Sequence, residues 1–201
     1  MPLLRAPSIF DDDFDRPVSL GAPPPLGKGS GFLLVVANSN VVKNTDLGKS
    51  VLLIKEKQSG LWGPPGGLTD KTDHSPLHAA MREFSEEVGA DWRRLANKTG
   101  QIAFARVRPV PGTAPSPNET WALYTKLSAQ QVEAALFTDN RSGWTLTQRM
   151  NYMGSKDAAG YAFVSVNALS KVDMKTGDFK IGSHAVKLRD PKRTLQAVGN
   201  L

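Results

Sequence analysis

Three glutamates, Glu83, Glu86 and Glu87, stand within five residues of one another. On a helix with about 100° between residues, this spacing places the three carboxylates side by side on one surface. Like charges so placed destabilise an exposed helix by about 0.2–0.5 kcal/mol for each pair. A cation bound among them would offset the repulsion, and an all-oxygen donor set favours Mg²⁺ or Mn²⁺. An ordinary charged helix face, with Arg82 and Glu86 as an i,i+4 pair, is the alternative interpretation.

The surrounding segment predicts the helix that these carboxylates need. Ser75 is a good N-cap, Pro76 suits the first helical position, and Gly89 suits the left-handed residue after the last turn. Apolar residues at helical spacing form a stripe roughly 100° wide, which predicts a core-facing side. Its members are Leu77, Ala80, Met81, Phe84 and Val88.

A stiff loop precedes the helix. Residues 61–67 read Leu-Trp-Gly-Pro-Pro-Gly-Gly, which disfavours a regular element. Residues 50–57 are apolar enough to form a strand before that loop. A strand, a Gly/Pro loop and a helix with an acidic face together favour a metal and phosphate site.

Residues 66–90 resemble the Nudix box, the signature of hydrolases that cleave nucleoside diphosphates linked to another moiety. That pattern reads Gly, five residues, Glu, seven residues, then Arg-Glu-apolar-any-Glu-Glu-any-Gly-apolar. Six residues match it position by position: Arg82, Glu83, Phe84, Glu86, Glu87 and Gly89. The resemblance implies an α/β fold, the Nudix-type α/β/α sandwich with a mixed central sheet.

The isolated glutamate of the pattern has no direct counterpart here. Counting back from Arg82 places it at His74, and counting forward from Gly67 places it at Asp73. The two counts differ because this loop is one residue longer than the pattern. Asp73, or else Asp70, could restore the missing charge, and His74 then faces solvent.

The resemblance also implies roles for the matching residues. Glu86 and Glu87 would bind the divalent ion, Mg²⁺ or Mn²⁺, and Glu83 would serve as a ligand or as the general base. A carbonyl of the Gly66-Gly67 pair, here assigned to Gly67, would complete the metal shell. Arg82 would orient the carboxylates through an ion pair.

Residues outside the box supply further candidates. Family members often take another acid from a late loop, where Asp157 is the carboxylate present here, and Glu119 is its competitor. Trp144 or Tyr152 is a candidate to stack on a base, since aromatic faces bind bases in that way. Three arginines are candidates to hold phosphate: Arg106, Arg149 and Arg141. A core aromatic or a surface cation is the alternative interpretation for each.

The composition of the chain limits the kinds of ligand and partner that we expect it to bind. The chain has 201 residues, 40% of them hydrophobic, which suffices for one sizeable core. With no cysteine, it has no disulfide, thiolate metal site or cysteine nucleophile. A net charge of +6 favours anionic partners, either a small nucleotide-type substrate or RNA. No apolar run approaches the roughly 18 residues of a membrane helix, and the start of the chain lacks a signal-peptide pattern, so no membrane partner and a cytoplasmic location are expected.

The first 30 residues differ from the rest. They hold six of the 14 prolines, including a Pro-Pro-Pro run that fits neither a helix interior nor a central strand. We expect residues 1–30 to form an extended Pro/Gly-rich arm before a Nudix hydrolase domain at 31–201. Ile9, Phe10 and Phe14 could bind the arm to the body or to a second copy in a homodimer, and a tail with incidental aromatics is the alternative.

The remaining pattern predicts alternating strands and helices. Strands are expected at residues 31–36, 100–107, 119–127 and 161–166, a hairpin at 175–187, and helices at 128–137 and 190–199. Residues 92–97 read as a connector, and residues 139–160 as the least regular part.

Three functions follow from these features. The first is a divalent-metal-dependent hydrolase that cleaves a phosphoanhydride in a nucleoside diphosphate linked to another moiety. The second keeps this chemistry but acts on capped RNA, as an mRNA-decapping enzyme would. The third is a non-catalytic Nudix-fold module that binds a nucleotide or RNA.

Overall fold

A computed structural model describes residues 29–38, 48–99, 102–106, 118–137, 143–152 and 157–199. The arm predicted at residues 1–30 lies outside these ranges except for its last two residues, so it stays a prediction. Arg141 and residues 153–156 also lie outside them.

A mixed seven-stranded sheet forms the centre of the molecule, with β3, β2, β1, β6 and β5 in that order. Strand β1 runs parallel to β6 and antiparallel to β2, while β5 is antiparallel to β6. Strand β7 pairs with β2 along the edge of β2 that faces away from β1. The strands are β1 (Ser30–Asn38), β2 (Lys49–Glu56), β3 (Trp62–Gly63), β4 (Gly66–Leu68), β5 (Ile102–Arg106), β6 (Asn118–Ser128) and β7 (Ala158–Ser165).

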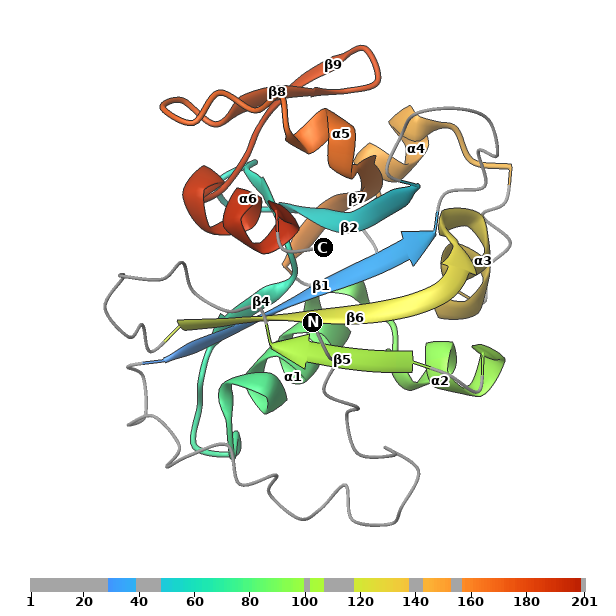
Figure 1. Cartoon of the computed structure of the whole chain (residues 1–201), viewed down its shortest axis with the longest axis vertical. Coiled ribbons are helices and arrows are strands. Elements are labelled where there is room, and N and C mark those ends of the chain that lie inside the picture. Colours follow the sequence, from blue (N-terminus) through green and yellow to red (C-terminus); the bar gives the residue numbers. More distant parts are fainter. Residues whose placement is uncertain are drawn as a thin grey trace.

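Two layers cover the sheet (Figure 1). On one face lie α1 (Pro76–Val88), α2 (Arg93–Thr99) and α3 (Ala129–Leu136); on the other lie α5 (Val166–Leu169), α6 (Pro191–Gly199) and the hairpin of β8 (Asp178–Ile181) and β9 (His184–Lys187). Because side chains alternate along a strand, Leu33 of β1 packs into the α1-side core and Leu34 into the opposite core. The predicted α/β/α sandwich with a mixed sheet is confirmed.

Helix α1 begins and ends where its caps predict. The Ser75 hydroxyl accepts from the backbone N–H of His78, and Gly89 takes a left-handed conformation with φ 70°. The apolar stripe packs against the sheet, with Phe84 completely buried. Glu87 is also buried, at 6% exposure, whereas the spacing places all three glutamates beside or behind the apolar stripe.

Two segments that we expected to be irregular form short helices. Residues 93–99 form α2 rather than a connector, and residues 146–150 within the irregular stretch form α4 (Leu146–Met150). Thr145 and Gln148 make a capping box at the start of α4, in which each side chain accepts from the other residue's backbone N–H. None of the helices in the described ranges is long and apolar enough to cross a membrane.

Candidate active site

One edge of strand β1 pairs with two different strands, β2 and β4. This pairing positions the Gly/Pro loop that lies between them. Residues 36–38 of β1 pair with β2, whereas residues 30–32 pair with β4. Between them, the backbone N–H of Leu33 donates to Pro65 O over 2.8 Å. The loop therefore lies against the middle of β1 and delivers Gly66 and Gly67 to the side of α1.

Two glycines let this loop approach the helix. Gly66 has φ 149°, a conformation that residues with a side chain rarely adopt. A Cβ on Gly67 would lie 2.5 Å from the carboxyl carbon of Glu83, so a side chain there would displace that carboxylate. Gly67 is therefore required by close packing against the acidic face of α1, and Gly66 by its backbone conformation and its contact with Phe32 of β1.

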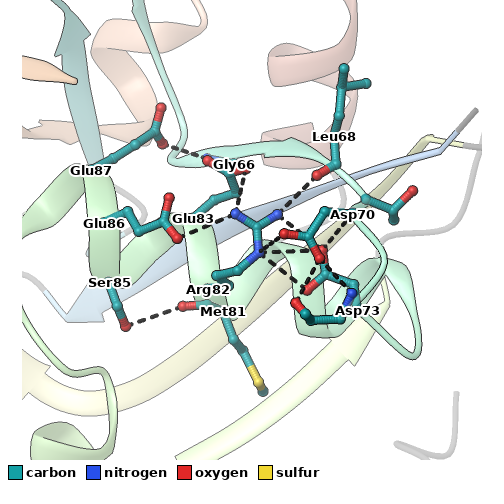
Figure 2. Close-up of polar contacts among 12 residues, drawn as sticks. Gly66, Leu68, Asp70, Asp73, Met81, Arg82, Glu83, Ser85, Glu86 and Glu87 are labelled. Carbon is teal, nitrogen blue, oxygen red and sulfur yellow. Dashed lines mark hydrogen bonds and ion pairs between the residues drawn. The ribbon is translucent and has the colours of Figure 1, made fainter. Parts of the chain in front are cut away.

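Arg82 lies at the centre of the acidic cluster (Figure 2). Its guanidinium donates to Asp73 and to Glu83, each over 2.9 Å, and to Glu86 over 3.4 Å. It also donates to the carbonyl of Leu68 over 3.0 Å. The hydrogen bond to Asp73 is the main cause of a raised Arg82 pKa. Arg82 therefore fixes two box glutamates and the preceding loop together.

Asp73, one of the two loop acids that could replace the isolated glutamate, is bonded to Arg82. Its side chain is 3% exposed and forms an ion pair with Arg82. The same carboxylate also accepts a hydrogen bond from the backbone N–H of Asp70. His74 is exposed, with its ring 5.3 Å from that of His78. Of the two counted positions, Asp73 rather than His74 contacts Arg82, and Asp70 forms a longer ion pair with the same guanidinium, at 3.5 Å.

Glu87 points away from Arg82, toward the glycine loop (Figure 2). Its Oε2 accepts from the backbone N–H of Gly66 over 2.7 Å. No Lys or Arg forms an ion pair with this buried carboxylate in the described part of the chain. Burial raises its pKa to about 7, against the opposing effects of the Gly66 hydrogen bond and the nearby Arg189 charge. Burial likewise raises the pKa of Glu83, although Arg82 acts in the opposite direction.

The donor chemistry of this site fits a hard divalent ion. Glu83, Glu86 and Glu87 supply carboxylate oxygens, and a buried carboxylate without an ion pair is stabilised by a cation. As the side chains stand, no three His, Cys, Asp or Glu side chains of the described residues are close enough together to hold a metal ion. Arg82, rather than a metal, is the group on which Glu83 and Glu86 converge.

The other predicted site residues are placed less uniformly. Asp157 is exposed just before β7, and its carbonyl accepts from the backbone N–H of Lys57. Glu119 accepts from the indole N–H of Trp121 over 3.1 Å. Arg106 lies on β5 opposite Trp121, and its side chain is outside the described part of the structure.

Arg149 forms an ion pair with a buried glutamate, and its role in holding phosphate stays a prediction. It bonds both carboxylate oxygens of Glu133, with Nη2 2.8 Å from Oε2, and this pairing raises the Arg149 pKa. Glu133 is buried and also accepts from the hydroxyl of Tyr161. Trp144 is half-buried with its ring 5.4 Å from that of Tyr152, in an aromatic cluster next to this pair.

Two residues near the box were not predicted as part of the site. Arg189 bonds Glu56 over 3.2 Å and the Pro64 carbonyl over 3.0 Å, and the charges of both Arg189 and Glu56 act on Glu87. These contacts join positions more than 120 residues apart. The sequence carries no local signal for them.

A family model for the NUDIX domain matches residues 34–180. The chain belongs to the Nudix family. The matched range begins within β1 and includes the glycine loop and the box. No curated protein matches the chain.

Solved Nudix structures resemble the fold at low identity. The NUDIX domain of Shewanella oneidensis NrtR, complexed with ADP ribose, is 13% identical, with a TM-score of 0.42 over 92% of this chain and 89% of that one. RenU, a Nudix hydrolase from M. smegmatis, is 16% identical, with a TM-score of 0.46 over 85% and 81%. An ADP-ribose pyrophosphatase from Streptococcus suis is 15% identical, with a TM-score of 0.41 over 87% and 88%.

Proposed function

We propose that this Nudix protein is a divalent-metal-dependent hydrolase that cleaves a phosphoanhydride bond in a nucleoside diphosphate linked to another moiety. One observation carries the proposal. Arg82 holds Glu83, Glu86 and Asp73 together beside Gly67, and Glu87 is buried against Gly66. Clustering acidic side chains around a glycine loop adds little to the stability of the fold. The same arrangement is suited to binding a divalent cation together with a phosphate chain.

Glu86, Glu87 and the carbonyl of Gly67 would hold Mg²⁺ or Mn²⁺. When bound, such an ion neutralises phosphate charge and lowers the pKa of a bound water. Glu83 serves as the general base in this proposal. Its Oε1 is occupied by Arg82, which leaves Oε2 to take the proton of the attacking water. Asp73 keeps Arg82, and through it Glu83, in position.

The two alternative functions lose part of their support. The capped-RNA hypothesis depends on the basic balance and on the region of Trp144 and Arg149, but Arg149 is bound to Glu133. The non-catalytic hypothesis depends on His74 and the lengthened loop, but Asp73 supplies a carboxylate to Arg82 despite the extra residue. A small-molecule substrate is therefore the proposal that the geometry favours. A homodimer stays a prediction.

A substrate panel tests the proposal. Nucleotide sugars, ADP-ribose, dinucleoside polyphosphates, oxidised triphosphates and capped RNA would be assayed with Mg²⁺, with Mn²⁺ and with EDTA. We expect hydrolysis of at least one non-RNA member that requires the metal. Glu83→Gln should lower kcat by about 100-fold or more, because a positioned base contributes about 10²–10⁴ in rate. Glu86→Gln should lower kcat to a similar extent, because it removes a carboxylate that would bind the ion.

Asp178→Asn is the matched control, since Asp178 is an exposed carboxylate on the hairpin of the opposite face. It should leave the rate unchanged. Hydrolysis that survives both glutamate substitutions and EDTA would contradict the proposal. Activity on capped RNA alone would favour the decapping alternative, and inertness across the panel would favour the binding module.

A further inference from the structure

Arg189 reaches the glycine loop from the opposite layer of the fold. It lies between β9 and α6, on the face of the sheet away from α1 (Figure 1). Its backbone N–H donates to Trp62 O over 2.6 Å, and its Nη2 donates to Pro64 O over 3.0 Å. Its Nη1 donates to Glu56 at the end of β2 over 3.2 Å. One residue thus holds two loop carbonyls and the strand that leads into the loop.

Trp62 and Gly63 pair with β2, but the two prolines that follow them offer few main-chain groups for attachment. Pro64 and Pro65 have no backbone N–H, so carbonyl groups provide their main-chain hydrogen bonds. Pro65 O accepts from Leu33 of β1, and Pro64 O accepts from Arg189. A Cβ on Gly63 would lie 3.2 Å from the Arg189 Nε, so the glycine leaves room for the guanidinium.

Arg189 also contacts the loop indirectly, through Phe32 of β1. Its guanidinium carbon lies 5.5 Å from the centre of the Phe32 ring. A Cβ on Gly66 would lie 2.7 Å from a carbon of that ring, so Phe32 directly adjoins Gly66. Arg189 therefore holds the loop just before Gly66 and packs on the ring that touches Gly66.

We propose that Arg189 is a positioning residue for the divalent-metal site. It fixes residues 62–65, so that Gly66 presents its N–H to Glu87 and Gly67 lies against Glu83. This inference rests on the proposed function, because the ion is the ligand that the positioned groups would share. It concerns a residue that lies outside the box in sequence and in the opposite layer of the fold.

Mn²⁺ binding measured by calorimetry, with thermal unfolding of the metal-free protein alongside, tests the inference. In Arg189→Gln, we expect the Kd for Mn²⁺ to rise about tenfold or more, within the 10–100-fold range for residues that support metal ligands. Loss of a positive charge alone would act in the opposite direction and tighten binding. Arg189→Lys should be impaired to a similar extent, because an ammonium group keeps the charge but lacks the planar fork that bonds two acceptors.

Two further variants separate positioning from simpler roles. Arg193→Gln is the matched control, since Arg193 also lies over Phe32, at 4.6 Å, but pairs with Asp190 instead of the loop. It should bind Mn²⁺ like the wild type. In the Arg189→Gln, Glu56→Gln double variant the two opposite charges are lost together, and we expect no recovery of affinity. Backbone hydrogen exchange at Leu33 and Gly66 should be faster in Arg189→Gln and unchanged in Arg193→Gln.

The outcomes are separable from those of the proposed function. Wild-type affinity or tighter in Arg189→Gln or Arg189→Lys would overturn the inference, as would recovery in the double variant. A lower unfolding temperature with unchanged Mn²⁺ affinity would show a merely structural role and would also overturn it. A wild-type protein that binds no Mn²⁺ would refute the proposed function, and the inference with it.

Discussion

The buried carboxylate of Glu87 should make the metal-free protein less stable than a variant without the charge. Its pKa is about 7 in the folded chain against 4.5 for an ordinary glutamate. Folding therefore favours the protonated form, so the contribution of Glu87 to stability is greatest below about pH 4.5 and is lost as pH rises through about 7. A difference of about 2.5 pKa units corresponds to about 3.4 kcal/mol as an upper limit.

Glu87→Gln removes this penalty while keeping an oxygen to accept the N–H of Gly66. Without metal, we expect the variant to exceed the wild type in free energy of unfolding by about 1–3 kcal/mol at pH 8 and to match it below about pH 4.5. Urea unfolding at several pH values, in the presence of EDTA, measures the difference. Glu86→Gln is the control, since the Glu86 side chain is 50% exposed and should change stability little at either pH.

Added Mn²⁺ should reverse the order at pH 8. An ion that binds only the folded state stabilises it, and the wild type should gain more than Glu87→Gln. A Glu87→Gln variant that is no more stable than the wild type at pH 8 in EDTA would refute the reasoning about burial. An equal gain from Mn²⁺ in both proteins would count against Glu87 as a ligand.

Three more substitutions test particular contacts. Asp73→Asn should lower kcat about 10–100-fold with little change in unfolding temperature, because it weakens the support of Arg82. Asp70→Asn, at an exposed neighbouring residue, should not lower kcat in this way. Equal effects of the two substitutions would contradict the role of Asp73. Gly67→Ala should lower kcat and Mn²⁺ affinity together, since its methyl group meets the Glu83 carboxylate; unchanged kinetics would show that the carboxylate moves freely. Arg149→Met should destabilise the fold by about 3–5 kcal/mol in urea unfolding, because Glu133 stays buried without its partner, and should leave KM unchanged; a raised KM would restore a phosphate-binding role.

Local chemistry explains which parts of the fold could be predicted. Helix α1 is specified by Ser75, Pro76 and Gly89, all adjacent in sequence to the turns that they cap. The Thr145 and Gln148 spacing of α4 is a readable capping box, but the helix is short and the segment around it lacks periodicity. Short elements with few apolar residues carry a weak signal even when their caps are present.

Tertiary contacts explain what could not be predicted. The choice between His74 and Asp73 depends on how the loop bends, and only the contact between Asp73 and Arg82 decides it. Burial of Glu87 depends on the approach of the Gly66 loop from another part of the sheet. Arg149 looks from the sequence like a free cation, because its partner Glu133 lies 16 residues away on a different helix.

The dependence of hydrolysis on Mg²⁺ tests the central claim most directly. Metal-free wild type and Glu86→Gln would be titrated with Mg²⁺ while release of the products from the best panel substrate is followed. We predict that the wild-type rate rises from near zero to saturation and that the Glu86→Gln rate stays about 100-fold lower at every Mg²⁺ concentration. A wild-type rate that is independent of Mg²⁺, or a Glu86→Gln curve that overlays the wild type, would contradict the account.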